Sequence, residues 1–440
     1  GVAYVTGVCD AFWTAAGLAV GTYVNWLIVA KRLRTYSDVC SAITIPDFFA
    51  NRYRDRKMLK CVSAIIIIIF FVPYTASGFA ACGKLFNSLF GVDYLTAMII
   101  SAIVIVAYTT LGGFLAASTS DFIQSIIMSI ALVIVLSYGI ISVGGFDGVV
   151  AHVGDLKGFL SITSTHDGAT NAATPYSVLS IASTLAWGLG YFGMPHILLR
   201  FMAIEDTKKL KLSRRVASVW VVISMSVAVS IGIIGYAMSA EGVIPNLKDS
   251  ETIIVQIAHV LSTHGIIFAI IAGVILAGIL ASTMSTSDSQ LLAASSSVSE
   301  NLLEGVLSLN LSAGVKIVVA RGSVIIISII AMFLASNPNS SVFQIVSFAW
   351  AGFGATFGPV MLFALFWKRS NKYGAISGMV AGGIMVFVWK FLVRPMGGVL
   401  GIYELLPAFI VASIFIVVVS LLTPAPEKEI VDEFESIKNY

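Results

Sequence analysis

Residues 266–280 read IIFAIIAGVILAGIL, and residues 281–290 continue as ASTMSTSDSQ. No charged side chain occurs between residues 265 and 287. A helix of this length crosses about 30 Å of hydrocarbon. The alternating ten-residue strands of outer-membrane barrels do not occur in the sequence. The stretch therefore predicts a transmembrane helix whose second half is rich in hydroxyl groups.

The composition extends this prediction to the whole chain. Hydrophobic residues make up 58% of the 440 residues and charged residues only 11%, with a mean hydropathy of +0.95. A soluble domain has roughly a quarter of its residues charged. We therefore expect an all-α membrane protein with about eleven transmembrane helices. We place them near 11–30, 61–88, 93–113, 119–144, 174–199, 216–239, 264–298, 317–336, 343–367, 374–393 and 402–423.

The connections between these helices alternate in charge. Most of the 26 basic residues lie in the tail and in connections within 31–60, 200–215, 316–321 and 368–372. Basic connections lie in the cytoplasm by the positive-inside rule, so Gly1 is expected outside and Tyr440 inside. The long connection 145–173 has little periodicity and is expected to be an extracellular loop. We expect one transmembrane transport domain, 1–423, and a cytoplasmic tail, 424–440, with a short amphipathic surface helix.

Other features narrow the class of protein. The chain opens with Gly1 inside membrane-like sequence, so we expect a piece that lacks the N-terminal part of its protein. The four cysteines lack metal-site spacing and are expected to be small apolar core residues. Glycine-rich phosphate loops, paired-Asp motifs and nucleophile elbows do not occur. The expected partners are the lipid bilayer and a small solute, with no nucleic acid and no enzymatic reaction.

The hydroxyl-rich half of the quoted helix is the first candidate site. Ser282, Ser285 and Thr286 are spaced i, i+3 and i+4, so they share one helix face. Three oxygens on one face suit a hard monovalent cation such as Na⁺. Asp288 adds a carboxylate in the same apolar segment. The alternative is that the hydroxyls bond to carbonyls one turn back or permit close helix packing.

A second candidate site is the stretch WGLGYFGMPH at residues 187–196. Its three glycines and one proline weaken a helix, and a broken helix at membrane depth must be buried or line a cavity. Trp187 and Tyr191 would form an aromatic wall on one face, and Pro73-Tyr74 marks another kinked span. The alternative is a kinked packing helix. Asp121 is either a helix cap or a cation ligand.

Several motifs together carry a resemblance to a known family. They are residues 21–26 (GTYVNW), 46–49 (PDFF), 108–115 (YTTLGGFL), 187–196, 284–286 (MST) and 349–359 (AWAGFGATFGP). In these motifs the chain resembles the solute:sodium symporters and is most similar to their proline branch. The resemblance implies an inverted-repeat fold of five plus five helices with the solute and ion at the bilayer midplane. It also implies two helices upstream of Gly1, one of them an unwound helix that supplies ligands.

The resemblance also implies roles for individual residues. Ser285 and Thr286 match the sodium-binding hydroxyl pair, and Ser282 matches a position that offers its backbone carbonyl. Asp121 matches an acidic residue tied to sodium coupling. The positions that match the substrate cavity of the proline branch are Tyr74, Trp187, Tyr191 and Pro195.

The function implied is sodium-coupled import of a small solute, and L-proline is the expected substrate. Aromatic walls suit the flat ring and secondary ammonium of proline. Two departures from the proline branch, Met194 and the acid Asp288, leave other substrates open, such as pantothenate or another amino acid. A solute sensor that keeps the fold without transport is the alternative from a different class. We further expect Asp121 and Asp288 to form a second, weaker sodium station toward the cytoplasm, with the Ser285–Thr286 pair between them, unless Asp288 only bonds neighbouring backbone.

Overall fold

A computed structural model describes residues 1–55, 57–309 and 311–437, with side chains at all of these except 113–116. Within this part of the chain, ten helices are long and apolar enough to cross a membrane. A shorter apolar segment, Val178–Phe192, accompanies them. The ten helices and the shorter segment match the eleven predicted spans one for one. The prediction of an all-α membrane fold is therefore confirmed.

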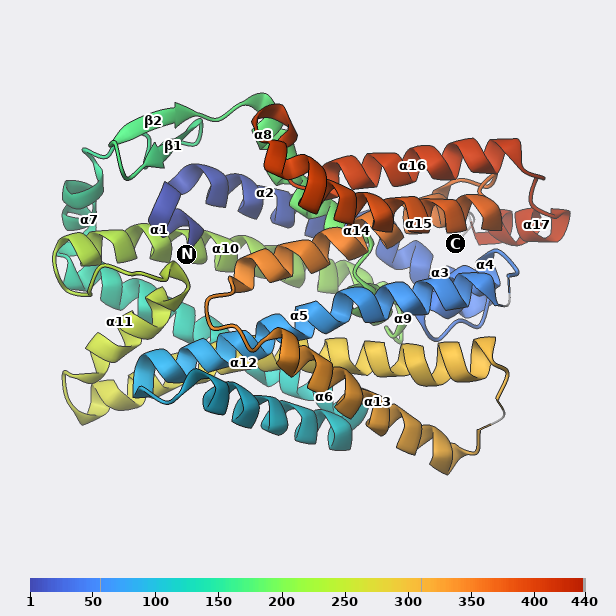
Figure 1. Cartoon of the computed structure of the whole chain (residues 1–440), viewed down its shortest axis with the longest axis horizontal. Coiled ribbons are helices and arrows are strands. Elements are labelled where there is room, and N and C mark those ends of the chain that lie inside the picture. Colours follow the sequence, from blue (N-terminus) through green and yellow to red (C-terminus); the bar gives the residue numbers. More distant parts are fainter. Residues whose placement is uncertain (56, 310, 438–440) are drawn as a thin grey trace.

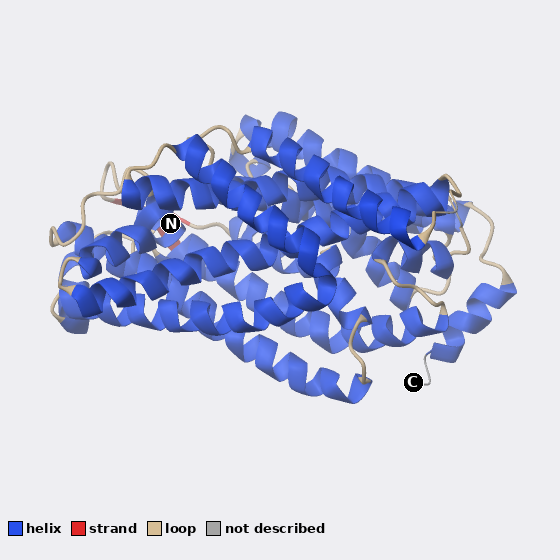
Figure 2. Ribbon diagram, turned by 90° about the horizontal axis from the view of Figure 1, so that it is seen from below, coloured by secondary structure: helices blue, strands red, loops and turns tan. Residues whose placement is uncertain are grey.

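The secondary structure is almost entirely helical (Figure 2). The α-helices are α1 (Val2–Thr6), α2 (Val8–Val24), α3 (Ala30–Val39), α4 (Ile45–Arg52), α5 (Met58–Phe90), α6 (Tyr94–Ser142), α7 (Gly145–Val153), α8 (Val178–Leu185), α9 (Pro195–Met202), α10 (Leu210–Ala240), α11 (Ile253–Ser262), α12 (Ile266–Ser296), α13 (Ala313–Leu334), α14 (Val342–Phe366), α15 (Lys372–Val388), α16 (Leu405–Leu422) and α17 (Lys428–Ser436). Short π-helical or 3₁₀ segments are η1 (Asn25–Val29), η2 (Ala186–Phe192), η3 (Thr207–Lys209), η4 (Ser250–Thr252), η5 (Ser297–Val306), η6 (Trp389–Val393), η7 (Arg394–Met396) and η8 (Gly398–Leu400).

The long helices run side by side along the length of the molecule (Figure 1). At one end lie α3, α4, α17 and the connection between α12 and α13. At the other end lie α7, α11 and the β-hairpin. The connections 31–60 and 424–440, both predicted to be cytoplasmic, thus share one end of the molecule.

Helix α6 supplies two spans rather than one. As a straight helix its 49 residues would reach about 70 Å, more than twice the hydrocarbon thickness. Its first part lies beside the later part of α12, because Tyr108 contacts Asp288. Its second part returns along α12, because Ala131 lies against Gly278. The two parts, Tyr94–Gly112 and Ala117–Ser142, are therefore separate crossings.

The connection 145–173 is more ordered than the sequence predicted. It contains α7 and the first strand of an antiparallel hairpin, β1 (Ser164–Asp167) paired with β2 (Ala172–Pro175). His166 in β1 is buried and packs edge-on against Phe159 at 5.5 Å. The sequence did not indicate these elements because a four-residue strand is too short to show a periodic pattern, and the prediction of an extracellular connection stays a prediction.

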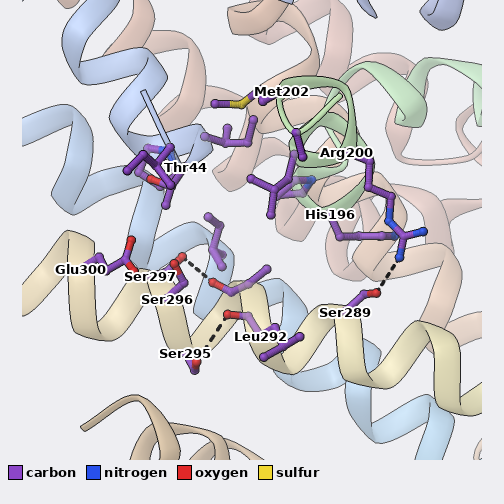
Figure 3. A pocket seen from close by; sticks show the side chains of 18 of the residues that line it. Thr44, His196, Arg200, Met202, Ser289, Leu292, Ser295, Ser296, Ser297 and Glu300 are labelled. Carbon is purple, nitrogen blue, oxygen red and sulfur yellow. Dashed lines mark hydrogen bonds between the residues drawn. The ribbon is translucent and has the colours of Figure 1, made fainter. Parts of the chain in front are cut away.

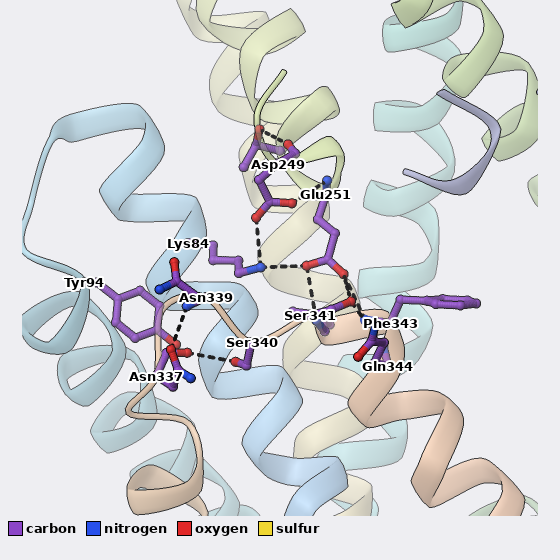
Figure 4. A network of polar contacts seen from close by, with 12 residues as sticks. Lys84, Tyr94, Asp249, Glu251, Asn337, Asn339, Ser340, Ser341, Phe343 and Gln344 are labelled. Atoms are coloured by element: carbon purple, nitrogen blue, oxygen red, sulfur yellow. Dashed lines mark hydrogen bonds and ion pairs between the residues drawn. The ribbon is translucent and has the colours of Figure 1, made fainter. Parts of the chain in front are cut away.

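An ion-pair network joins α5, η4 and α14 at the hairpin end (Figure 4). The Lys84 ammonium lies 2.9 Å from Asp249 and 2.7 Å from Glu251. Glu251 also accepts hydrogen bonds from the Ser341 hydroxyl at 2.9 Å and the Phe343 amide at 3.0 Å. Burial alone would raise the pKa of Glu251, but the Lys84 and α14 hydrogen bonds hold that pKa below its ordinary value. The carboxylate therefore stays charged at the N-terminus of α14, where an anion is favoured.

Candidate functional site

The segment α8–η2–α9 is broken because glycines bring its backbone against two other helices. A Cβ at Gly188 would collide with the backbone oxygen of Gly17 in α2. A Cβ at Gly193 would collide with the backbone oxygen of Phe353 in α14. Only glycine permits approaches this close. Pro195 then restarts the helix as the first residue of α9, where its fixed φ and missing N–H are tolerated.

Side chains satisfy two of the carbonyls that this break leaves free. Trp350 in α14 donates its indole N–H to the Trp187 carbonyl at 2.8 Å. Asn25 donates its amide N–H to the Tyr191 carbonyl at 3.0 Å. Unpaired backbone groups are costly in hydrocarbon, so these two bonds fix the conformation of η2.

Trp187 lies inside an aromatic cluster rather than on an open wall. Its ring stacks on Tyr403 at 5.0 Å and 19°, and on Phe343 at 5.5 Å and 30°. The residue is only 8% exposed. Tyr191 meets Trp350 edge-on at 5.0 Å, and Trp350 is 6.2 Å from Trp187. Trp350, which the sequence analysis did not select, thus links the two predicted aromatic residues.

Tyr74 and Pro195 meet the same region from α5 and α9. The Tyr74 ring lies edge-on to the ring of His196 at 6.4 Å. His196 directly follows Pro195 in the first turn of α9. Tyr74 and Tyr191 both pack against the main hydrophobic core. The four residues predicted for the substrate cavity therefore come from η2, α9 and α5. Trp350 contacts both Trp187 and Tyr191, and His196, the neighbour of Pro195, contacts Tyr74.

Two of the three predicted hydroxyls of α12 bond to the same carbonyl oxygen. Ser285 and Thr286 both donate to the Ser282 carbonyl, at 3.2 and 3.1 Å. The Ser282 hydroxyl donates to the carbonyl of Ile279 at 2.7 Å. The bonding to carbonyls one turn back is thus present. Each hydroxyl oxygen keeps its lone pairs as acceptors, and the three residues are at least partly exposed.

Asp288 is buried in the protein and does not face lipid. It is 0% exposed, and its Oδ2 accepts a hydrogen bond from the Tyr108 hydroxyl at 2.8 Å. The Tyr108 hydroxyl also lies 3.1 Å from the Met284 carbonyl. The second carboxylate oxygen, Oδ1, is buried without a hydrogen-bond partner among the described residues. A buried oxygen of this kind is one of the rarer features of a folded protein.

Asp121 lies within α6 and forms an ion pair with Arg200 of α9. Asp121 lies inside the crossing Ala117–Ser142, its Oδ2 binds Arg200 and its Oδ1 has no hydrogen-bond partner among the described residues, so the interpretation of Asp121 as a helix cap was wrong. Arg200 also donates to the Ser289 hydroxyl at 2.9 Å. Asp121 and Asp288 lie close enough to interact electrostatically. The cation beside Asp121 is thus Arg200, which the sequence analysis did not place in the site.

A cavity of about 590 Å³ connects α9 with the later part of α12 (Figure 3). Pro195, His196 and Arg200 line it from α9, and Ser289 lines it from α12. Further hydroxyl groups from the end of α12 and from η5 line its other side. His196 Nδ1 is buried without a hydrogen-bond partner among the described residues. The cavity therefore extends from Arg200, the partner of Asp121, to His196, whose ring lies beside Tyr74.

Comparison with known proteins agrees with this architecture. The chain matches the sodium:solute symporter family over residues 1–382. It is 41% identical to a high-affinity proline transporter of Bacillus subtilis, with 100% of this chain and 89% of the relative covered. It is 40% identical to an osmoregulated proline transporter of the same organism, with 97% and 84% covered. A sodium/proline symporter of Haemophilus influenzae is 39% identical, with 99% and 85% covered.

Solved structures share the fold at much lower sequence identity. A Na⁺-coupled sialic acid symporter superposes with a TM-score of 0.73 at 15% identity, covering 97% of this chain and 86% of the other. A nucleobase-cation-symport-1 family transporter superposes with a TM-score of 0.56 at 12% identity, covering 99% and 91%. Both comparisons support the inverted-repeat arrangement of helices.

Proposed function

Because the chain belongs to the sodium:solute symporter family, we propose that it imports L-proline together with Na⁺. The observation that carries the choice of proline is identity of about 40% to proline transporters over nearly the whole chain. The chain is a multi-pass secondary transporter of the cell membrane and not an enzyme. The Na⁺ gradient supplies the energy, at about 2.3 kcal/mol per charge for each 100 mV of membrane potential plus a concentration contribution.

The proposed substrate site consists of Tyr74, Trp187, Tyr191 and Pro195. The glycine approaches and the two side-chain bonds to carbonyls hold η2 as a 3₁₀ segment that interrupts the α-helical conformation between α8 and α9. Aromatic faces attract a cationic ammonium, and they also suit a flat apolar ring. Proline offers both features. The wall would be formed mainly by Tyr191 and Tyr74, because Trp187 is largely occupied by Tyr403 and Phe343.

The proposed sodium site uses oxygens of Ser282, Ser285 and Thr286. Na⁺ prefers several neutral or anionic oxygens, and the Ser282 carbonyl with the Ser285 and Thr286 hydroxyls brings three oxygens together. The two hydroxyl hydrogens point to that carbonyl, so the hydroxyl lone pairs are directed elsewhere and can accept a cation.

We assign Asp121 and Asp288 to a second, weaker station for Na⁺ on the route to the cytoplasm. Two carboxylates at this depth repel each other unless a cation is near. Arg200 supplies one positive charge to Asp121, whereas Asp288 is hydrogen-bonded by the neutral Tyr108 and forms no ion pair within the described residues. A passing Na⁺ would therefore favour Asp288. Asp288→Asn should alter the rate of Na⁺ release to the cytoplasmic side more than Asp121→Asn does. Equal release rates for wild type and Asp288→Asn would remove Asp288 from the route.

The proposed orientation places the α3–α4 end in the cytoplasm and the β-hairpin outside. The support is the gathering of Lys and Arg in connections at the α3–α4 end. The transport domain is then 1–423, and the tail 424–440 is cytoplasmic.

The proposal is tested with purified protein in proteoliposomes. Labelled proline should accumulate with an inward Na⁺ gradient and should not accumulate when K⁺ replaces Na⁺. Excess unlabelled pantothenate should leave the uptake unchanged. Inhibition by pantothenate with poor inhibition by proline would reassign the substrate. Proline binding without any uptake would favour the alternative of a solute sensor.

A further inference from the structure

The C-terminal helix α17 docks against the rest of the molecule through an apolar face. Ile430, Phe434 and Ile437 are buried, and Phe434 is only 1% exposed. Phe434 and Ile437 belong to the main hydrophobic core. In Figure 1, α17 lies beside α3 and α4 at one end of the molecule. An amphipathic helix that merely lay at the surface, as the sequence predicted, would not bury a phenylalanine this completely.

Phe434 lies against two arginines that come from different helices. The Arg32 guanidinium carbon is 5.2 Å from the centre of the Phe434 ring, and that of Arg52 is 5.0 Å from it. Arg32 belongs to α3 and also covers Phe366, the last residue of α14, at 4.9 Å. Arg52, the last residue of α4, donates its Nε–H to the Ala364 carbonyl of α14 at 3.0 Å. The side chain of Phe434 therefore completes a joint between α3, α4 and the end of α14.

Ion pairs add a second ring of contacts around this joint. Arg54 pairs with Glu429 and lies 3.6 Å from Glu433. Lys368, in the connection between α14 and α15, lies 3.1 Å from Glu435. The side chains of Arg54 and Glu429 are 43% and 74% exposed. Exposed ion pairs contribute little to stability. The buried Phe434 side chain therefore supplies most of the free energy of docking, and the ion pairs determine the position in which α17 docks.

The docked joint leaves several polar groups unsatisfied. Nη1 and Nη2 of Arg52 are buried without hydrogen-bond partners among the described residues, although Arg52 is fully buried. The same is true of three further atoms, which are also buried without hydrogen-bond partners among the described residues: Nε and Nη2 of Arg32 and the hydroxyl oxygen of Tyr36. Unsatisfied buried donors oppose the docked state, and the ring faces of Phe434 and Tyr36 offset only part of this cost. These unpaired groups lower the free energy that docking of α17 gains.

In the five-plus-five arrangement that the family resemblance implies, the helices that the joint connects belong to different repeats. In an inverted-repeat transporter, alternating access comes from rocking of one repeat or bundle against the other. Helices α2 and α3 follow the start of the first repeat, and α14 is the last helix of the second. A contact that holds α3 against α14 stabilises only those conformations in which the two ends are close together.

We propose that α17 is a releasable latch that slows the transport cycle while Phe434 is docked between Arg32 and Arg52. Release of the helix frees the ends of α3 and α14 to separate and speeds the return of the transporter. The contacts of Phe434 and the ion pairs described above involve none of the residues assigned to the solute and sodium sites. It concerns the rate of cycling rather than affinity.

The test compares Phe434→Ala with Asp432→Ala, a control on the exposed side of the same helix. Phe434→Ala should raise the maximal rate of Na⁺-dependent proline uptake by about two- to fivefold and leave both half-saturation constants unchanged. Hydrogen exchange of residues 428–437 should become faster in this variant. Asp432→Ala should behave as wild type. A lower rate that falls together with the melting temperature would overturn the latch and leave α17 a structural element.

Cross-linking tests the opposite state. Lys368→Cys with Glu435→Cys, in a protein whose four native cysteines are replaced, holds α17 in place when joined by a short cleavable reagent. Uptake should fall several-fold after cross-linking and recover after cleavage. Unchanged uptake in the cross-linked protein would refute the proposal. If wild type takes up no proline, the substrate proposal fails instead, and hydrogen exchange still reports whether Phe434 holds the helix.

Discussion

At the scale of residues, the sodium site rests on the Ser285 and Thr286 hydroxyls. We predict that Ser285→Ala and Thr286→Ala each raise the Na⁺ concentration for half-maximal uptake by roughly ten- to a hundredfold. The reason is the loss of an oxygen ligand to a cation, worth about 1.5–3 kcal/mol. The matched control is Thr283→Val. Thr283 makes the same bond to a carbonyl one turn back, at 3.1 Å, but its methyl faces Gly78 of α5.

The control should keep the Na⁺ dependence of wild type. If all three variants shift the dependence equally, the effect comes from the helix and not from a site. If Ser285→Ala and Thr286→Ala leave the dependence unchanged, the assignment of these hydroxyls to sodium is wrong.

The aromatic residues of η2 are predicted to separate into a substrate contact and a packing residue. Tyr191→Ala should weaken proline binding by about 1–3 kcal/mol, with little change in Na⁺ affinity. Trp187→Ala should weaken binding too, but it should also lower the melting temperature, because it opens a hole among Tyr403, Phe343 and Trp350. Calorimetric binding and thermal unfolding measure the two effects. Proline affinity equal to wild type in both variants would move the cavity elsewhere.

The sequence predicted faces of helices better than it predicted partners. The i, i+3, i+4 spacing correctly placed Ser285 and Thr286 with Ser282 on one face. It could not show that Tyr108 would meet Asp288 or that Arg200 would pair with Asp121. Those pairs join residues far apart in the chain, and periodicity within one helix contains no information about its neighbour. The sequence analysis counted Arg200 among the basic residues of a cytoplasmic connection.

At the scale of elements, glycines decide how closely α2 packs against the broken segment. A Cβ at Gly21 would collide with backbone atoms of Gly188. We predict that Gly21→Ala destabilises the protein by at least about 1–3 kcal/mol, because neither backbone can move aside as a side chain could. The measurement is the melting temperature together with the amount of folded protein in the membrane.

The control for this prediction is Gly273→Ala in α12. A Cβ at Gly273 meets no atom within 4 Å, and alanine is the better helix former. Gly273→Ala should therefore be neutral or slightly stabilising. Equal stability of Gly21→Ala and wild type would show that α2 and η2 lie farther apart than this packing requires.

Element boundaries were predicted well where apolar runs are long and poorly where they are short. The eleven spans follow from hydrophobicity alone, because lipid forces nearly every spanning residue to be apolar. The sequence also pointed to the break at Gly188–Gly193. It did not indicate α7 or the hairpin, whose short elements are stabilised by contacts such as His166 on Phe159. Nor did it indicate that α17 would be anchored, because the two arginines that hold Phe434 lie far away in sequence.

At the scale of the whole molecule, the two ends differ in charge and in the elements that they carry. Translocation of a basic connection across the membrane is disfavoured, so the end with α3 and α4 should remain in the cytoplasm. This argument uses only the distribution of Lys and Arg and is independent of the solute. It can therefore be tested even if the transported substrate is not proline.

We predict that Ala169, at the turn of the hairpin, faces outside and that Ala425, just before α17, faces the cytoplasm. Both residues are exposed. Each is changed to cysteine separately in a protein that lacks the native cysteines, and right-side-out vesicles are treated with a membrane-impermeant maleimide. Ala169→Cys should be labelled at once, and Ala425→Cys only after the membrane is permeabilised. The reverse pattern would invert the molecule, and the latch on α17 would then lie on the outer surface.

Labelling of both cysteines before permeabilisation would mean that the chain crosses the membrane an even number of times between residues 169 and 425. That count would contradict the seven crossings from the broken segment to α16 on which the proposed topology depends.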